Sequence, residues 1–162
     1  MHRAARCGFT LLEMLIVMLV IGIASAFVMV TFDGDDRRTA EREAARLAGA
    51  LEHAAALAQW RRETLGVSAE GGAYRFWRRG DDDRWTALAD DDVLAPRALP
   101  AHLTVTPATY AGAPIPADAI VPFRPSGHNE PFTLLLGAPA WTLVVAGDPL
   151  NRVQIAAYAA SR

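Results

Sequence analysis

The chain has 162 residues, a length that suits one domain with an appendage, and its net charge of −2 excludes a general attraction to nucleic acid or anionic lipid. All 16 basic residues are arginine, and Cys7 is the single cysteine, which excludes an intramolecular disulfide. Apolar residues make up 52% of the chain, but only the first 32 residues contain a segment apolar enough for a membrane, and the remainder has the composition of a soluble domain.

Residues 9–32 form this apolar segment, in which Glu13 is the only charged residue and no proline occurs. As a helix the segment would be about 36 Å long, enough to cross a hydrocarbon core of about 30 Å. Basic residues precede it, and acidic residues follow it directly: His2, Arg3 and Arg6 before, and Asp33, Asp35 and Asp36 after. This asymmetry favours a cytoplasmic N-terminus and an exported C-terminal domain.

Two simpler interpretations of the segment compete with a functional one. A cleaved secretory signal would use Ala24-Ser25-Ala26 as its cleavage site, but the apolar run continues to Val30 and begins with a carboxylate. A plain membrane anchor explains the length of the segment but not Glu13.

Glu13 is costly inside an apolar span, by about 2.5–3.5 kcal/mol, and such residues usually have a partner and a function. If the chain were cut between Gly8 and Phe9, a new α-amine with a pKa of about 7.7–8.0 would appear one helical turn away. This amine could neutralise Glu13 of the same or a neighbouring chain, and a carboxylate near a helix N-terminus also complements the helix dipole.

Residues 7–17, which read CGFTLLEMLIV, resemble the class III signal of type IV pilins and type II secretion pseudopilins. The resemblance implies that prepilin peptidase removes residues 1–8 by cleaving between Gly8 and Phe9, and that Phe9 is then N-methylated. It also implies that Glu13 pairs with the amine of an adjacent subunit during assembly. The protein would then be a single-pass protein of the bacterial inner membrane, with residues 9–32 in the membrane and its C-terminal domain in the periplasm.

Residues 33–64 are predicted to be a helical stalk, because alanine and leucine recur there at spacings of three and four. The residues on this repeating face are Ala40, Ala44, Leu47, Leu51, Ala55 and Ala58. The acidic stretch 33–36 leaves open whether the helix is continuous with the apolar segment. His53 is interpreted as a surface or packed residue, and residues 60–62 (Trp-Arg-Arg) as the end of a docked helix or a small interaction patch.

Residues 65–162 are predicted to fold as an antiparallel β-domain, which gives an α+β, pilin-like fold class. Residues 65–69 and 73–78 flank a glycine turn and predict a β-hairpin. Glycine-, aspartate- and proline-rich turns separate further candidate strands at 84–88, 103–106, 120–123, 132–136, 141–145 and 153–156.

Residues 120–127 (IVPFRPSG) and 131–136 (PFTLLL) resemble the late region of the GspH/FimT branch of pseudopilins. This second resemblance implies a minor pseudopilin in the tip of the type II secretion pseudopilus, beside the I, J and K type minor pseudopilins and the major pseudopilin. The alternative is a FimT-like minor pilin of a type IV pilus, used in pilus assembly or DNA uptake. DNA uptake would need a basic stripe, whereas Arg152 and Arg162 are the only basic residues after Asp148, so no nucleic acid partner is expected.

No catalytic or metal-binding constellation is apparent, so an anchored periplasmic enzyme is the weakest alternative, and no catalytic residue, metal or cofactor is predicted. Ser126-Gly127-His128 lacks the glycine pattern of a nucleophile elbow and is interpreted as a turn. The aspartate runs 81–83 and 90–92 lack the alternating ligand spacing of a calcium loop. The four histidines are scattered at positions 2, 53, 102 and 128, without zinc-site spacing.

Overall fold

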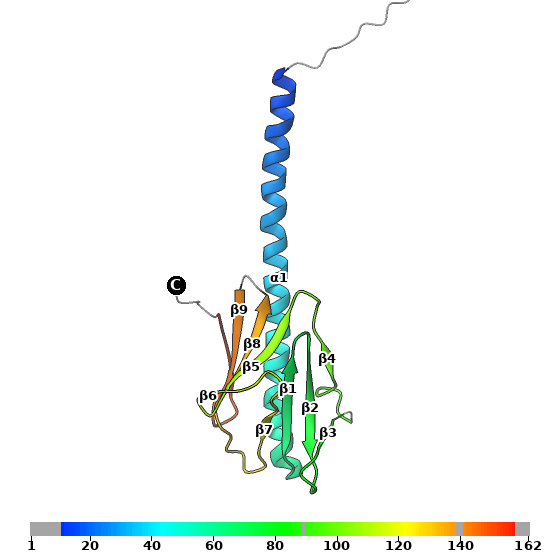
Figure 1. Cartoon of the computed structure of the whole chain (residues 1–162), viewed down its shortest axis with the longest axis vertical. Helices are drawn as coiled ribbons and strands as arrows, with labels where there is room; N and C mark the ends of the chain where they lie inside the picture. The colour runs from blue at the N-terminus through cyan, green and yellow to red at the C-terminus, as the bar shows by residue number, and fades with distance from the viewer. Residues whose placement is uncertain (1–10, 89, 139–140, 158–162) are drawn as a thin grey trace, which may run out of the picture. The chain divides into compact units, whose positions relative to one another are not determined.

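The computed structural model describes residues 11–88, 90–138 and 141–157, except for the side chains of residues 23–35. It divides into two compact units, residues 1–39 and residues 40–162. One helix is followed by strands that pair antiparallel throughout in two sheets (Figure 1), which confirms the predicted α+β class.

Helix α1 spans Leu11–Arg61 without a break, so the acidic stretch 33–36 does not interrupt it. Within the second unit, its predicted apolar face is buried as the three-and-four spacing requires. The six residues of that face are all at most 1% exposed: Ala40, Ala44, Leu47, Leu51, Ala55 and Ala58. They form one core with the inner faces of the strands.

The helix ends in a Schellman arrangement. The Glu63 N–H donates to the Ala58 carbonyl at 3.1 Å, and the Arg62 N–H donates to the Gln59 carbonyl at 3.3 Å. Arg62 has a φ of 56°, in the left-handed region where glycine is usual. The chain therefore turns sharply into the first strand at the expense of backbone strain at Arg62.

We expect Arg62→Gly to raise the free energy of unfolding by about 0.5–1 kcal/mol. Glycine adopts a left-handed φ without strain, and this gain exceeds the additional conformational entropy that glycine loses on folding. Urea unfolding of the two proteins measures the difference. Arg62→Ala is the matched control, since it removes the same side chain but keeps the strain. An equal gain in both variants would contradict the strain argument.

The first sheet has the order β3-β2-β1-β7, with β4 also paired to β2. Its strands are β1 (Leu65–Glu70), β2 (Ala73–Arg79), β3 (Trp85–Ala87), β4 (Arg97–Ala98) and β7 (Val121–Phe123). The predicted hairpin is β1–β2, with Val67 opposite Phe76. Both side chains are buried on the face towards the core, while Ser68 and Trp77 lie on the outer face.

The second sheet has the order β10-β9-β8-β5-β6. Its strands are β5 (Thr104–Tyr110), β6 (Ala113–Pro114), β8 (Phe132–Ala138), β9 (Trp141–Gly147) and β10 (Val153–Ala157). Phe132 lies opposite Gly147 in the β8–β9 register and packs edge-on against Phe123 of the other sheet, with ring centroids 5.7 Å apart. The Phe132 ring occupies the space that a side chain at position 147 would need.

The two-residue strands β4 and β6 were not predicted. Each adds only two pairing positions, to β2 and β5 respectively, and two residues carry no alternation that a pattern could reveal.

Candidate functional site

The N-terminal part of α1 presents apolar side chains on every side. Residues 11–22 are all exposed, including Leu11 (84%) and Met18 (72%), and Glu13 is their only charged side chain. Leucine, isoleucine, valine and methionine are rarely exposed in such a continuous run unless they contact a partner or lipid. We refer to this surface, residues 11–22, as the assembly segment.

Gly8 and Phe9, the predicted cleavage and methylation residues, lie outside the described residues. So do the side chains at 23–32, which belong to the predicted membrane segment. In the part of the chain that the structure describes, no helix combines the length and apolar character needed to cross a membrane.

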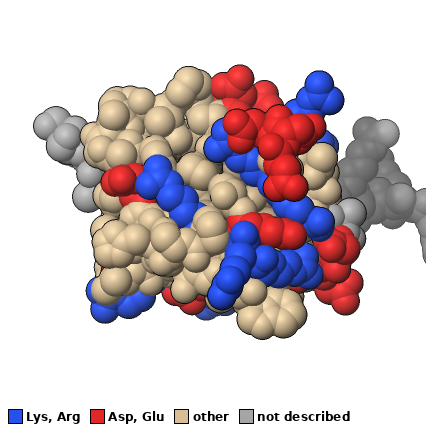
Figure 2. All heavy atoms as spheres, turned by 90° about the horizontal axis from the view of Figure 1, so that it is seen from below, with Lys and Arg blue, Asp and Glu red and all other residues tan. Residues whose placement is uncertain are grey.

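A cluster of charges lies at the C-terminal end of α1, and sequence reasoning did not find it. Arg78 Nη2 lies 3.1 Å from Asp90 Oδ2, and Arg61 Nη1 lies 3.5 Å from the same oxygen. Arg78 Nε also lies 3.4 Å from Glu63. Figure 2 shows basic and acidic side chains interleaved on this end of the domain rather than gathered into a field of one sign. Trp60, which precedes Arg61 in the chain, is 80% exposed.

His53 of α1 is paired with Asp91, 38 residues later. His53 Nε2 lies 3.1 Å from Asp91 Oδ2, and Asp91 Oδ1 accepts the N–H groups of Val93 and Leu94 at 2.9 and 3.1 Å. Leu94 is fully buried. The pair therefore fixes the loop after β3 against the helix, which gives His53 a structural partner that the sequence did not reveal.

Burial alone would raise the pKa of the Asp91 carboxyl, but hydrogen bonds from His53, Leu94 and Val93 outweigh it and hold that pKa below its ordinary value. A carboxyl with a lowered folded-state pKa stabilises the fold above its unfolded pKa of about 3.9. That contribution is lost as the pH falls through the folded-state pKa.

We therefore expect Asp91→Asn to be less stable than the unmodified chain by about 0.5–1 kcal/mol at pH 7, and to lose this deficit below about pH 4. Asparagine keeps the oxygen that accepts the Val93 and Leu94 N–H groups, so the comparison isolates the charged oxygen that faces His53. Unfolding by urea at a series of pH values measures it, and a deficit that does not shrink as the pH falls below about 4 would contradict the assignment.

A bidentate pair joins α1 to β4. The Arg97 guanidinium donates to Glu43 at 2.6 and 3.2 Å, and the Glu43 side chain is only 13% exposed. The hydrogen bond to Glu43 raises the pKa of Arg97. Burial, and then the Glu43 charge, raise the pKa of the neighbouring Tyr74. This pair explains why two residues suffice for β4: its first residue is held by the helix.

The predicted Pro-Ser-Gly turn is present, and a buried asparagine organises it. Asn129, 4% exposed, accepts the Arg124 N–H at 2.6 Å and donates to Asn151 of the β9–β10 loop. Asn151 donates to the Gly127 carbonyl at 2.9 Å. Within the described part of the chain, the Ser126 hydroxyl bonds only backbone groups of His128, which is the geometry of a turn and not of a nucleophile and base.

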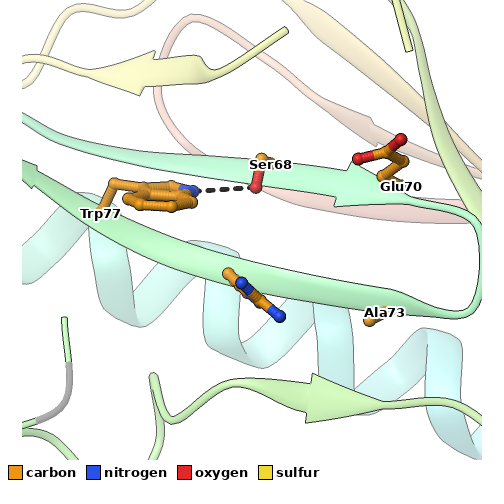
Figure 3. A pocket seen from close by; sticks show the side chains of 5 residues that line it. Ser68, Glu70, Ala73 and Trp77 are labelled. Carbon is orange, nitrogen blue, oxygen red and sulfur yellow. Dashed lines mark hydrogen bonds between the residues drawn. The ribbon is translucent and has the colours of Figure 1, made fainter. Parts of the chain in front are cut away.

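A shallow groove of ≈ 200 Å³ lies on the outer face of the first sheet (Figure 3). Ser68, Glu70, Arg75 and Trp77 line it, and the Trp77 indole N–H donates to the Ser68 hydroxyl at 2.8 Å. Indole is not a base, so this contact cannot activate the serine.

The two aspartate runs are engaged by protein groups. Asp83 lies 3.2 Å from Arg79, Asp82 accepts the Arg84 N–H at 3.2 Å, and Asp90 and Asp91 have the partners given above. Among the described residues, no three histidine, cysteine, aspartate or glutamate side chains are grouped so as to hold a metal ion.

The models of two protein families match the chain. "Type II transport protein GspH" matches residues 43–150, and "Prokaryotic N-terminal methylation motif" matches residues 3–29, which contain Gly8, Phe9 and Glu13.

Curated relatives agree with the family match. The chain is 30% identical to type II secretion system protein H of Escherichia coli K12, over 90% of this chain and 92% of that protein. It is also 30% identical to the Aeromonas hydrophila protein of the same name, over 62% of this chain, although that alignment spans only 56% of the relative's length.

Solved structures show the same fold. The minor pseudopilin EpsH of the Vibrio cholerae type II secretion system superposes with a TM-score of 0.62 at 18% identity, covering 77% of this chain and 98% of that one. The solution structure of E. coli GspH gives 0.54 at 22% identity, covering 79% and 95%. The resemblance drawn from residues 120–136 is thus confirmed, and the chain belongs to the GspH family of type II transport proteins.

Proposed function

We propose that the chain is a minor pseudopilin that works in the tip of the type II secretion pseudopilus and supports protein export across the outer membrane. The observation that carries this proposal is the exposed apolar assembly segment with its one carboxylate, inside the match to the N-terminal methylation motif, in a chain of the GspH family. In this function residues 9–32 anchor the subunit in the inner membrane, and the β-domain lies in the periplasm. Its partners are the I, J and K type minor pseudopilins and the major pseudopilin.

Three steps describe the mechanism. Prepilin peptidase cleaves between Gly8 and Phe9, which creates an amine close to Glu13, and Phe9 is methylated. The assembly segment then packs against the helices of other subunits, and the subunit moves from the bilayer into a bundle of like helices. Pairing of the Glu13 carboxylate with an amine removes the cost of an isolated charge in that apolar bundle.

Processing is tested with Gly8→Ala. We expect the variant recovered from the host envelope to keep residues 1–8, whereas the unmodified chain begins at a methylated Phe9; intact mass distinguishes the two. The chain has no lysine, so an unmethylated α-amine would be its only primary amine, and an amine-specific reagent reports on the N-terminus alone.

Gly22→Ala is the matched control, because a methyl group at position 22 meets nothing within 4 Å. It should be processed normally. An unmodified chain that still begins at Met1, or that begins near Phe27, would contradict the proposed function.

A further inference from the structure

The outer edge of β10 differs from the other sheet edges of the described chain. The first sheet ends in β3 and β7, of three residues each, and the second ends in β6, of two residues. Proline lies in β7 at position 122 and in β6 at position 114. β10 ends the second sheet with five residues and no proline. Short length and proline are the usual means of blocking an edge, and β10 has neither.

The hairpin geometry shows which backbone groups of β10 face outward. The Asp148 N–H donates to the Arg152 carbonyl at 3.0 Å, and Val153 lies opposite Gly147. Inward and outward backbone groups alternate along an antiparallel strand, so those of Gln154 and Ala156 face β9 while those of Val153, Ile155 and Ala157 face away.

A contact on α1 agrees with this alternation. The Val153 N–H donates to Glu52 Oε1 at 2.9 Å, on the side away from β9. Ile155 and Ala157 are then the positions whose N–H and C=O groups have no ladder partner among the described strands.

The side chains of β10 do not protect this edge either. Gln154, Ile155, Ala156 and Ala157 are exposed, Ile155 to 41%, and none is charged. Asp148 and Arg152 bond each other at 2.8 Å before the strand begins, and the Glu52 carboxylate accepts the N–H of Val153, the first residue of the strand. An exposed, uncharged, proline-free edge is the form in which a sheet accepts a strand from another chain.

We propose that the free edge of β10 pairs with an extended, uncharged segment of a different, neighbouring pseudopilin, an inference that rests on the proposed function. Glu52 joins the edge to the exposed side of α1, so a neighbour packed along the helix reaches the strand directly. Small side chains in β10 let an uncharged strand approach as closely as neighbouring strands lie in a sheet. A strand with charged side chains would have to give up their hydration at the same place, which costs free energy.

A second copy of this chain does not fit the edge. Residues 40–61 of α1 run alongside the strands of the domain (Figure 1), so a two-fold β10–β10 pair would point the two helices in opposite directions. Helices that enter a fibre from one membrane point the same way. Head-to-tail pairing would need one of the other edges, which are short or carry proline.

Hydrogen exchange of single amides tests the proposal, with the purified I, J and K type pseudopilins of the same host as probes. We expect the Ile155 and Ala157 amides to exchange rapidly in the free chain and about tenfold or more slowly in the complex. The Gln154 and Ala156 amides, already bonded to β9, should be slow in both.

Ile155→Pro removes an outward donor without removing a bond to β9, and Ile155→Ala removes the same side chain but keeps the donor. We expect the proline variant to bind at least about tenfold more weakly than the alanine variant, with similar thermal midpoints. If the proline variant does not fold, the hydrogen exchange of the unmodified chain still shows whether the edge of β10 pairs with the partner.

Two results would overturn the proposal in distinguishable ways. A complex in which Ile155 and Ala157 exchange as in the free chain, or in which both variants bind equally, overturns the edge site and leaves the proposed function standing. Failure of the unmodified chain to bind any of the pseudopilins overturns the proposed function, and the edge site with it.

Discussion

Glu13→Ala is expected to leave the chain in the inner membrane but to remove it from the assembled pseudopilus. Alanine makes the apolar segment more apolar, so insertion is kept or improved. In the fibre, however, the α-amine of an adjacent subunit then lacks its carboxylate. Loss of one member of a buried ion pair costs about 3–5 kcal/mol, which corresponds to about a hundredfold or more in recruitment.

Recruitment is measured as the amount of the chain that co-purifies with the other pseudopilins, relative to the amount in the membrane. Glu41→Ala is the matched control, because Glu41 lies on the exposed side of the same helix, beyond the assembly segment. Normal recruitment of Glu13→Ala, or an equal loss in Glu41→Ala, would contradict the pairing of Glu13 with an amine.

Leu51→Ala is expected to lower the free energy of unfolding of the β-domain by about 2–5 kcal/mol. Leu51 is fully buried in the core between α1 and the two sheets. Its truncation loses the transfer energy of the removed methyl groups and leaves a cavity that closely packed neighbours fill only in part. Urea unfolding of the full-length protein in detergent measures the change.

Leu150→Ala provides the same chemical change at a site that is 62% exposed, in the β9–β10 loop. We expect it to alter the free energy of unfolding by about 0.5 kcal/mol or less. Comparable losses in the two variants would show that the alanine-rich face of α1 does not anchor the domain.

Local patterns sufficed for much of the fold. The apolar spacing from Ala40 to Ala58 identified the buried side of α1, because a helix repeats every 3.6 residues whatever it packs against. Alternation and glycine turns located the hairpin β1–β2, strand β3, and the strands from β5 to β10, apart from β6. The motif around Gly8, Phe9 and Glu13 pointed to the family because its spacing is fixed along the chain.

Polar contacts between distant segments could not be predicted in the same way. His53 and Asp91 are 38 residues apart, Glu43 and Arg97 are 54 apart, and Asn129 and Asn151 are 22 apart. Each of these side chains is equally compatible with a solvated surface position until the tertiary fold brings its partner near. The free edge of β10 likewise depends on strand order, which a single sequence does not specify.

The packing of Phe132 over Gly147 makes two positions of the chain depend on each other. They face one another across β8 and β9, and the aromatic ring fills the volume that glycine leaves empty. A methyl group at position 147 is compatible with this core only if the ring is replaced by something smaller. Relatives that diverge at one of these positions should therefore have changed the other as well, so that the pair is inherited as a unit.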